Sequence, residues 1–93
     1  MTQVTLKFTG EMWERTRIFQ TGFAFEGASL GDLLRAVLAQ YNLRDLVLDD
    51  SDRFIFRSGV LVNGRSARYL GGLAAPIQTG DEVIVMRPSI GAM

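Results

Sequence analysis

Apolar and polar residues alternate at the start of the chain, which is the pattern of a half-buried β-strand. Val4, Leu6 and Phe8 are separated by single polar residues, and a period of two places these apolar side chains on one face of a sheet. Residues 10–15 break the alternation and predict the turn of a hairpin. The β-prone run 17–25 then predicts the second strand of that hairpin.

Two residues of this hairpin bear on its geometry. Gly22 lies within the second predicted strand, where an isolated glycine is a candidate β-bulge. Trp13 lies in the predicted turn. We expect its ring to fold back on the end of the sheet, in preference to a role in binding a partner.

Apolar residues next recur with the period of an α-helix. Ser29 is a good N-cap residue, and Asp32 three positions later suits both a capping box and the positive end of a helix dipole. Asn42 is expected to end the helix. The apolar stripe consists of Leu30, Leu33, Leu34, Val37, Leu38 and Tyr41. Such a stripe predicts one amphipathic helix that covers a sheet.

The second half of the chain predicts further strands joined by tight turns. Residues 53–62 are rich in β-prone residues, and Asn63-Gly64 favours a type I′ turn because both central residues of that turn need a positive φ. A short return strand is expected over 66–70, and a final strand over 82–87. Apolar residues on both parities of the final strand predict that both of its faces are covered, at least in a complex with a partner.

The order of the predicted elements defines the fold class. A hairpin, a crossover helix and a parallel return strand form the β-grasp (ubiquitin-like) arrangement, which satisfies the right-handed crossover rule. We therefore predict an α+β fold with a mixed sheet of about five strands packed on one main helix. Residues 1–88 are expected to form this single domain, with 89–93 as a flexible C-terminal tail.

Composition excludes several classes of function. The chain has neither cysteine nor histidine, so it lacks thiolate metal ligands, a cysteine nucleophile and the commonest general acid–base. Its 10 basic and 10 acidic residues cancel, which argues against a nucleic-acid or membrane-surface binder. The acidic run 49–52 lacks the spacing of a calcium loop and is expected to be a solvated loop. With no leader pattern and no apolar run of the ~20 residues that a membrane helix needs, we expect a cytoplasmic protein.

Several short motifs of the second half occur in a distinctive order. They are Val60-Leu61-Val62-Asn63-Gly64, then Leu70-Gly71-Gly72-Leu73, then Gly80-Asp81-Glu82-Val83, then Pro88 with a glycine near the end. In this order and spacing they resemble the small subunit of molybdopterin synthase, and more broadly the MoaD/ThiS group of ubiquitin-like sulfur carriers. The first strand, the turn containing Glu11 and Arg15, and the helix after Ser29 fit the same layout, so the resemblance covers nearly the whole chain.

The resemblance implies a carrier and not an enzyme, with no catalytic residue, metal or bound cofactor of its own. In that family an E1-like partner uses ATP to adenylate the carboxylate of a Gly-Gly tail, and sulfur is loaded as a thiocarboxylate. A large synthase subunit then takes the tail into its active site and transfers the sulfur to a pterin precursor. Terminal glycines suit this task because a tail without Cβ atoms can enter a narrow channel.

The chain departs from the family pattern in this tail. Gly91 falls on the first family glycine, Ala92 replaces the terminal glycine, and Met93 is an additional residue, which places the carboxylate about 3.3 Å further out. Three accounts remain open: the tail is trimmed before use, a divergent partner accepts Gly-Ala-Met, or the chain is a non-conjugating β-grasp interaction subunit. An RNA-binding β-grasp module is disfavoured, because the arginines are dispersed and balanced by acids.

The final strand also predicts a surface for the partner. Val83 and Val85 share a parity and should face the helix, which leaves Ile84 and Met86 on an apolar outer face. The alternative is that segment 53–56 simply packs over this strand. The predicted partner-binding residues are Leu61, Ile84, Met86, Arg87, Pro88 and Ile90.

Overall fold

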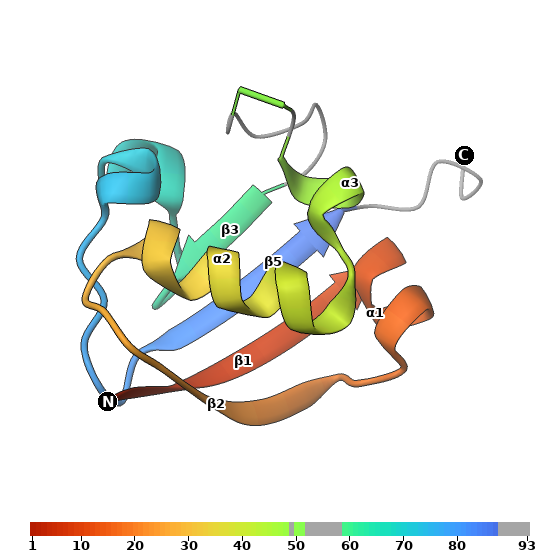
Figure 1. Ribbon diagram of the computed structural model, residues 1–93, viewed down its shortest axis with the longest axis horizontal. Coiled ribbons are helices and arrows are strands. Elements are labelled where there is room, and N and C mark those ends of the chain that lie inside the picture. The colour runs from red at the N-terminus through yellow and green to blue at the C-terminus, as the bar shows by residue number, and fades with distance from the viewer. Residues whose placement is uncertain (49, 52–58, 88–93) are drawn as a thin grey trace.

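One mixed sheet of five strands is crossed by a single long helix (Figure 1). The computed structural model describes residues 1–48, 50–51 and 59–87. The strands are β1 (Thr2–Gly10), β2 (Gln20–Phe25), β3 (Gly59–Val62), β4 (Arg65–Ser66) and β5 (Glu82–Arg87). The helices are α1 (Glu11–Thr16), α2 (Leu30–Tyr41) and α3 (Arg44–Val47), with 3₁₀ turns η1 (Ala67–Tyr69) and η2 (Gly72–Ala74).

The sheet has the order β2-β1-β5-β3-β4. β1 pairs with β5 in parallel, and the other neighbours are antiparallel. A parallel pair needs a crossover, and α2 lies within the connection from the β1–β2 hairpin to the rest of the sheet. This arrangement confirms the predicted α+β, β-grasp fold.

Helix α2 begins and ends where the sequence predicts. The Asp32 N–H donates to Ser29 Oγ, and the Ser29 N–H donates to the Asp32 carboxylate, which is a complete capping box. Asn42 closes the other end in a left-handed conformation with φ 56°. The pKa of Asp32 lies below its usual value because hydrogen bonds from the Ser29 side chain and the Ala28 N–H favour the charged carboxylate.

The core lies between α2 and one face of the sheet. Leu6 and Phe8 of β1 pair with Val83 and Val85 of β5, and these side chains are fully buried. The buried face of α2 consists of Leu30, Leu33, Leu34, Val37 and Leu38. Tyr41, the sixth residue of the predicted stripe, packs edge-on against Phe8 with ring centroids 5.3 Å apart.

Three local predictions were wrong. The connection 10–15 is not a simple turn: it contains helix α1. The return strand predicted over 66–70 is reduced to β4, because the chain turns at once into η1. Gly22 is not a bulge, since β1 and β2 pair in unbroken register from Thr2 to Lys7.

The Asn63-Gly64 turn is confirmed by φ values of 51° and 84°.

No helix of the described ranges is long and apolar enough to cross a membrane.

The strand predicted over 53–62 is confirmed for β3 only, because residues 52–58 lie outside the described part of the chain.

Candidate partner-binding face and the end of β5

The two faces of β5 have different surroundings. Val83 and Val85 point toward α2 and are fully buried. Ile84 and Met86 alternate with them and are only half-buried, on the opposite face of the sheet. The structure therefore confirms which residues of the final strand face the helix, and shows that no described element covers the other face fully.

Leu61 of β3 lies directly beside Ile84 in the antiparallel register, and Gly59 lies beside Met86. A Cβ atom added to Gly59 would lie 3.7 Å from Met86 Cγ, so the Met86 side chain lies over this glycine. Leu61, Ile84 and Met86 form one half-buried apolar strip across two strands, which we call the sheet patch. The sequence analysis placed Ile84 and Met86 on this outer face and included Leu61 among the predicted partner-binding residues.

An ion pair lies beside the sheet patch. Lys7 of β1 is the parallel neighbour of Ile84, and its Nζ lies 3.1 Å from Oε2 of Glu82. The two side chains are partly exposed, so the pair contributes little to the free energy of unfolding. Its effect is to give the patch a border without net charge.

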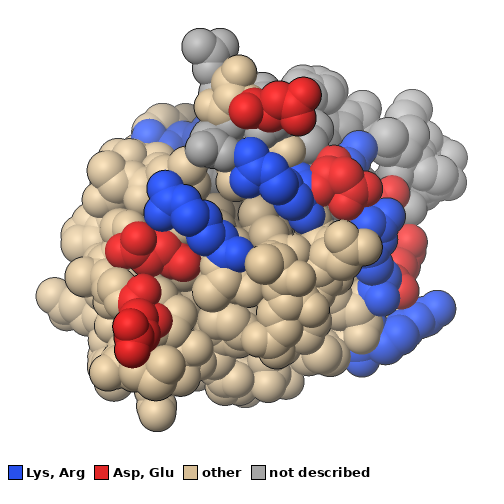
Figure 2. All heavy atoms as spheres, in the orientation of Figure 1, with Lys and Arg blue, Asp and Glu red and all other residues tan. Residues whose placement is uncertain are grey.

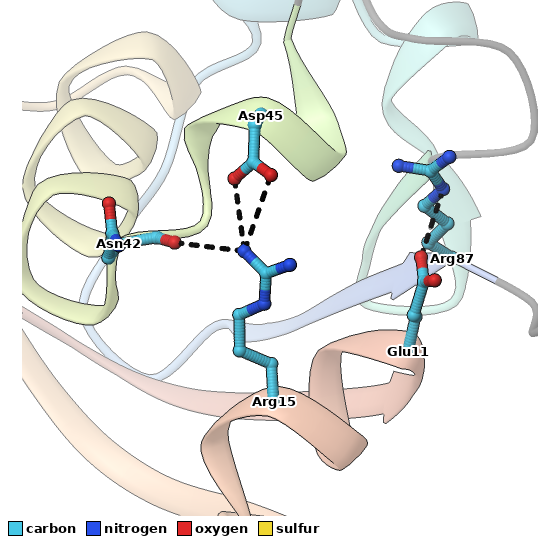
Figure 3. Close-up of polar contacts among 5 residues, drawn as sticks. All are labelled: Glu11, Arg15, Asn42, Asp45 and Arg87. Carbon is cyan, nitrogen blue, oxygen red and sulfur yellow. Dashed lines mark hydrogen bonds and ion pairs between the residues drawn. The ribbon is translucent and has the colours of Figure 1, made fainter.

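Arg87 lies next to the sheet patch in sequence but on the other face of β5. Its Nε lies 3.2 Å from Oε2 of Glu11, the first residue of α1, and the two side chains are 19% and 35% exposed (Figure 3). The contact is an ion pair without the alignment of a hydrogen bond. It ties the end of β5 to the start of α1.

A second ion pair anchors the other end of α1. Arg15 Nη1 lies 3.1 and 3.3 Å from the two carboxylate oxygens of Asp45, and 3.4 Å from the carbonyl oxygen of Asn42 (Figure 3). This side chain therefore joins α1 to the C-terminal cap of α2 and to α3. Together the two contacts hold α1 beside the end of β5.

The structure brings together only part of the predicted site. Leu61, Ile84 and Met86 form the sheet patch, whereas Arg87 is turned away from it toward Glu11. The remaining predicted residues lie outside the described part of the chain: Pro88, Ile90, Gly91, Ala92 and Met93.

Sequence reasoning missed the role of Glu11, which depends on α1. A signal was present: Glu11 and Glu14 lie in the first turn of α1 and Arg15 in its last, the distribution that complements a helix dipole. The partner of Glu11 could not be found in this way, because Arg87 is far away in sequence.

Trp13 of α1 only partly follows its prediction. It lines a shallow hollow of about 320 Å³ with Phe8 and Phe19 at the end of the sheet. Trp13 is nevertheless 39% exposed, and the guanidinium of Arg17 lies 5.0 Å from the ring centroid. Such a cation–π contact shields one face of the ring from water.

The charges on the α2 side of the molecule are mixed. Positive and negative side chains alternate over the upper and right-hand parts of the view in Figure 2, and no large area has one sign. Within the described residues, no group of three or more acidic side chains could hold a metal ion.

No protein-family model and no curated protein matches the sequence. Solved structures do match over almost the whole chain. The small archaeal modifier protein 1 of H. volcanii is 22% identical with a TM-score of 0.80, covering 95% of this chain and 99% of that one. The putative molybdopterin converting factor, subunit 1, of Pyrococcus furiosus is 20% identical with a TM-score of 0.74, covering 95% and 99%.

A chain of the Amycolatopsis orientalis BexX/CysO complex is also similar. It is 19% identical with a TM-score of 0.74, and the match covers 91% of this chain and 94% of that one. The sheet order, the single crossing helix and these matches agree with the resemblance found in the sequence motifs. The chain therefore has the ubiquitin-like β-grasp fold.

Proposed function

We propose that this chain is a ubiquitin-like sulfur carrier that works with partner enzymes and has no catalytic residue of its own. The observation that carries the proposal is the end of β5. This central strand presents Ile84 and Met86 on an open face, and its last residue is held by Glu11. The proposed docking surface would thus lie directly before the residues that would carry the reacting carboxylate.

The chemistry requires little from the carrier itself. Its C-terminal carboxylate attacks the α-phosphate of ATP, pyrophosphate leaves, and an acyl-adenylate forms. Hydrosulfide then attacks the acyl carbon and displaces AMP, which leaves a thiocarboxylate. The nucleophile is the chain's own carboxylate, so the absence of cysteine and histidine is compatible with this role.

Two partners follow from the proposal. An E1-like adenylating enzyme would bind ATP and activate the carboxylate, and we propose that this reaction takes place in the cytoplasm. A large synthase subunit would accept the sulfur for delivery to a molybdopterin-type or related cofactor. The similar chain in the BexX/CysO complex supports a carrier that docks on a partner protein.

Docking is proposed to use the sheet patch. Leu61, Ile84 and Met86 are half-buried and apolar, and burial of such side chains against a partner contributes about 25 cal/mol per Å² of apolar area. The Lys7–Glu82 pair beside them supplies the polar rim that protein interfaces share.

A second candidate function is a non-conjugating β-grasp interaction subunit. The specific observation in its favour is Ala92 followed by Met93 at the position of the family's terminal glycine. Such a subunit would still use the sheet patch, but Gly91 would carry no reaction.

An exchange assay separates the two candidates. The activating enzyme from the same source would be incubated with ATP, labelled pyrophosphate and this chain. A carrier supports incorporation of label into ATP, and Gly91→Val lowers it because a branched side chain obstructs entry of the tail. The full chain and two shortened chains, which end at Ala92 and at Gly91, would be compared. If none of the three supports exchange, the interaction subunit is favoured.

A further inference from the structure

The free edge of β2 is open for pairing with another strand. β2 is the first strand of the sheet order, with β1 as its only neighbour in the described structure. The Phe8 N–H donates to the Phe19 carbonyl oxygen at 3.0 Å, which makes these two residues a hydrogen-bonded pair. Continuing this register, the backbone groups of Gln20, Gly22 and Ala24 point away from β1.

A contact on the other side of β1 agrees with this alternation. The Thr5 N–H donates toward the β5 side, to the carbonyl oxygen of Asp81, at 2.9 Å. Thr5 is the register partner of Gly22, so neither residue of this pair directs its backbone groups to the other. The Gly22 carbonyl accepts from Thr21 Oγ1 at 3.2 Å, which leaves its second lone pair for another donor.

Strand β2 has none of the features that usually protect an edge. Its sequence QTGFAF contains no charge and no proline, and its pairing with β1 has no bulge. Natural proteins commonly use these features, or a covering element, to prevent pairing of exposed edges. Figure 2 shows uncharged surface along the lower rim of the molecule, which is the position of β2 in Figure 1.

The charges that flank β2 select the direction of an added strand. Exposed Arg17 precedes the strand and exposed Glu26 follows it. A second copy added in antiparallel direction would place Arg17 of each chain near Glu26 of the other. A parallel addition would place like charges together, which is unfavourable.

We propose that β2 is a self-association edge, at which two copies of this chain pair antiparallel about a two-fold axis at Gly22. In this register Gln20, Gly22 and Ala24 bond to Ala24, Gly22 and Gln20 of the second copy. All outward backbone groups of β2 are then satisfied. The interface lies away from the sheet patch, because β1 separates β2 from β5.

The paired edges would form a small interface. A strand of 6 residues buries less than the roughly 800 Å² per partner of a standard interface, so the dimer is reversible and depends on concentration.

Cysteine cross-linking tests both the dimer and its register, because the chain has no cysteine of its own. In a hydrogen-bonded antiparallel pair the Cα atoms are about 5.5 Å apart, within disulfide range. Gly22→Cys should therefore form a covalent dimer in a glutathione buffer. Ala24→Cys is the matched control, since its two copies would be offset by about 13 Å along the strand. Equal cross-linking of the two variants overturns the proposal.

Sedimentation velocity over a concentration series provides the second measurement. The unaltered chain and Gly22→Ala should shift from monomer to dimer, because an added Cβ at Gly22 meets open space. Gln20→Lys with Ala24→Lys should remain monomeric, and Gln20→Glu with Ala24→Lys should restore the dimer, with circular dichroism confirming folding. The proposal is contradicted if the unaltered chain stays monomeric at every concentration. It is also contradicted if the chain binds an added strand peptide but does not dimerise.

Discussion

Glu11 and Arg87 join the start of α1 to the end of β5 through an ion pair of 3.2 Å. Both side chains are largely shielded from water, at 35% and 19% exposure. A charge in such a position needs its partner more than one on the open surface does. This contact fixes the last described residue of the strand that leads to the proposed carrier tail.

Replacing Glu11 tests the stabilising effect of this ion pair. Glu11→Gln leaves the Arg87 guanidinium partly buried without a counter-charge, so we expect the free energy of unfolding to fall by about 1–2 kcal/mol. Urea unfolding followed by circular dichroism measures this change. Glu11→Gln combined with Arg87→Met should recover part of the loss; a double variant less stable than the single one would contradict the account.

A charge in the sheet patch should block docking without unfolding the chain. Ile84→Arg places a guanidinium in an apolar interface, and we expect affinity for the partner to fall at least about tenfold, or 1.4 kcal/mol. Titration calorimetry with the partner measures it. Gln40→Arg adds the same side chain at an exposed position of α2, on the other side of the sheet. Equal effects of the two variants would remove the sheet patch as the docking surface.

The capping box predicts a pH dependence of stability. The pKa of Asp32 is lowered in the folded chain, so its carboxylate contributes stability above the unfolded pKa of about 3.9. That contribution is lost as the pH falls through the lower folded pKa. Asp32→Asn should therefore destabilise the chain at pH 7 and flatten its stability profile below about pH 4. An unchanged acid profile, measured by urea midpoints, would exclude this role.

Asn63 should be more important than its exposed position suggests. Its Nδ2 donates to Asp81 Oδ1 at 3.0 Å, and its Oδ1 accepts from the Glu82 N–H at 2.9 Å. Asn63→Ala removes both bonds and a residue that tolerates φ 51°, so we expect a loss of about 1–3 kcal/mol in thermal or urea unfolding. Gln40→Ala, an exposed helical change, serves as the control and should have little effect.

Local sequence patterns were sufficient for the elements whose geometry is locally determined. The apolar stripe after Ser29 and the cap at Asn42 predicted α2, and alternation around Leu6 predicted β1. Patterns at Ile84 and Met86 also gave the two faces of β5, because a strand alternates strictly.

Features that depend on tertiary contacts were not predictable in the same way. Helix α1 has only 6 residues, too few to be stable by itself, and Arg15 and Glu11 hold it through partners distant in sequence. Strict alternation along β5 places Arg87 on the opposite face from Met86, and so away from the sheet patch. The sequence analysis nevertheless included Arg87 with Met86 in the predicted site, because the two residues are adjacent in sequence. The end of β4 is set by η1, which packs on β3.

The most direct test of the carrier proposal is the intact mass of the chain isolated from its own source, with the C-terminal residues identified by fragmentation. The account predicts a fraction in which one oxygen of the terminal carboxyl is replaced by sulfur, and which increases when the activating enzyme, ATP and sulfide are supplied. A homogeneous chain with an unmodified carboxylate under both conditions would contradict it.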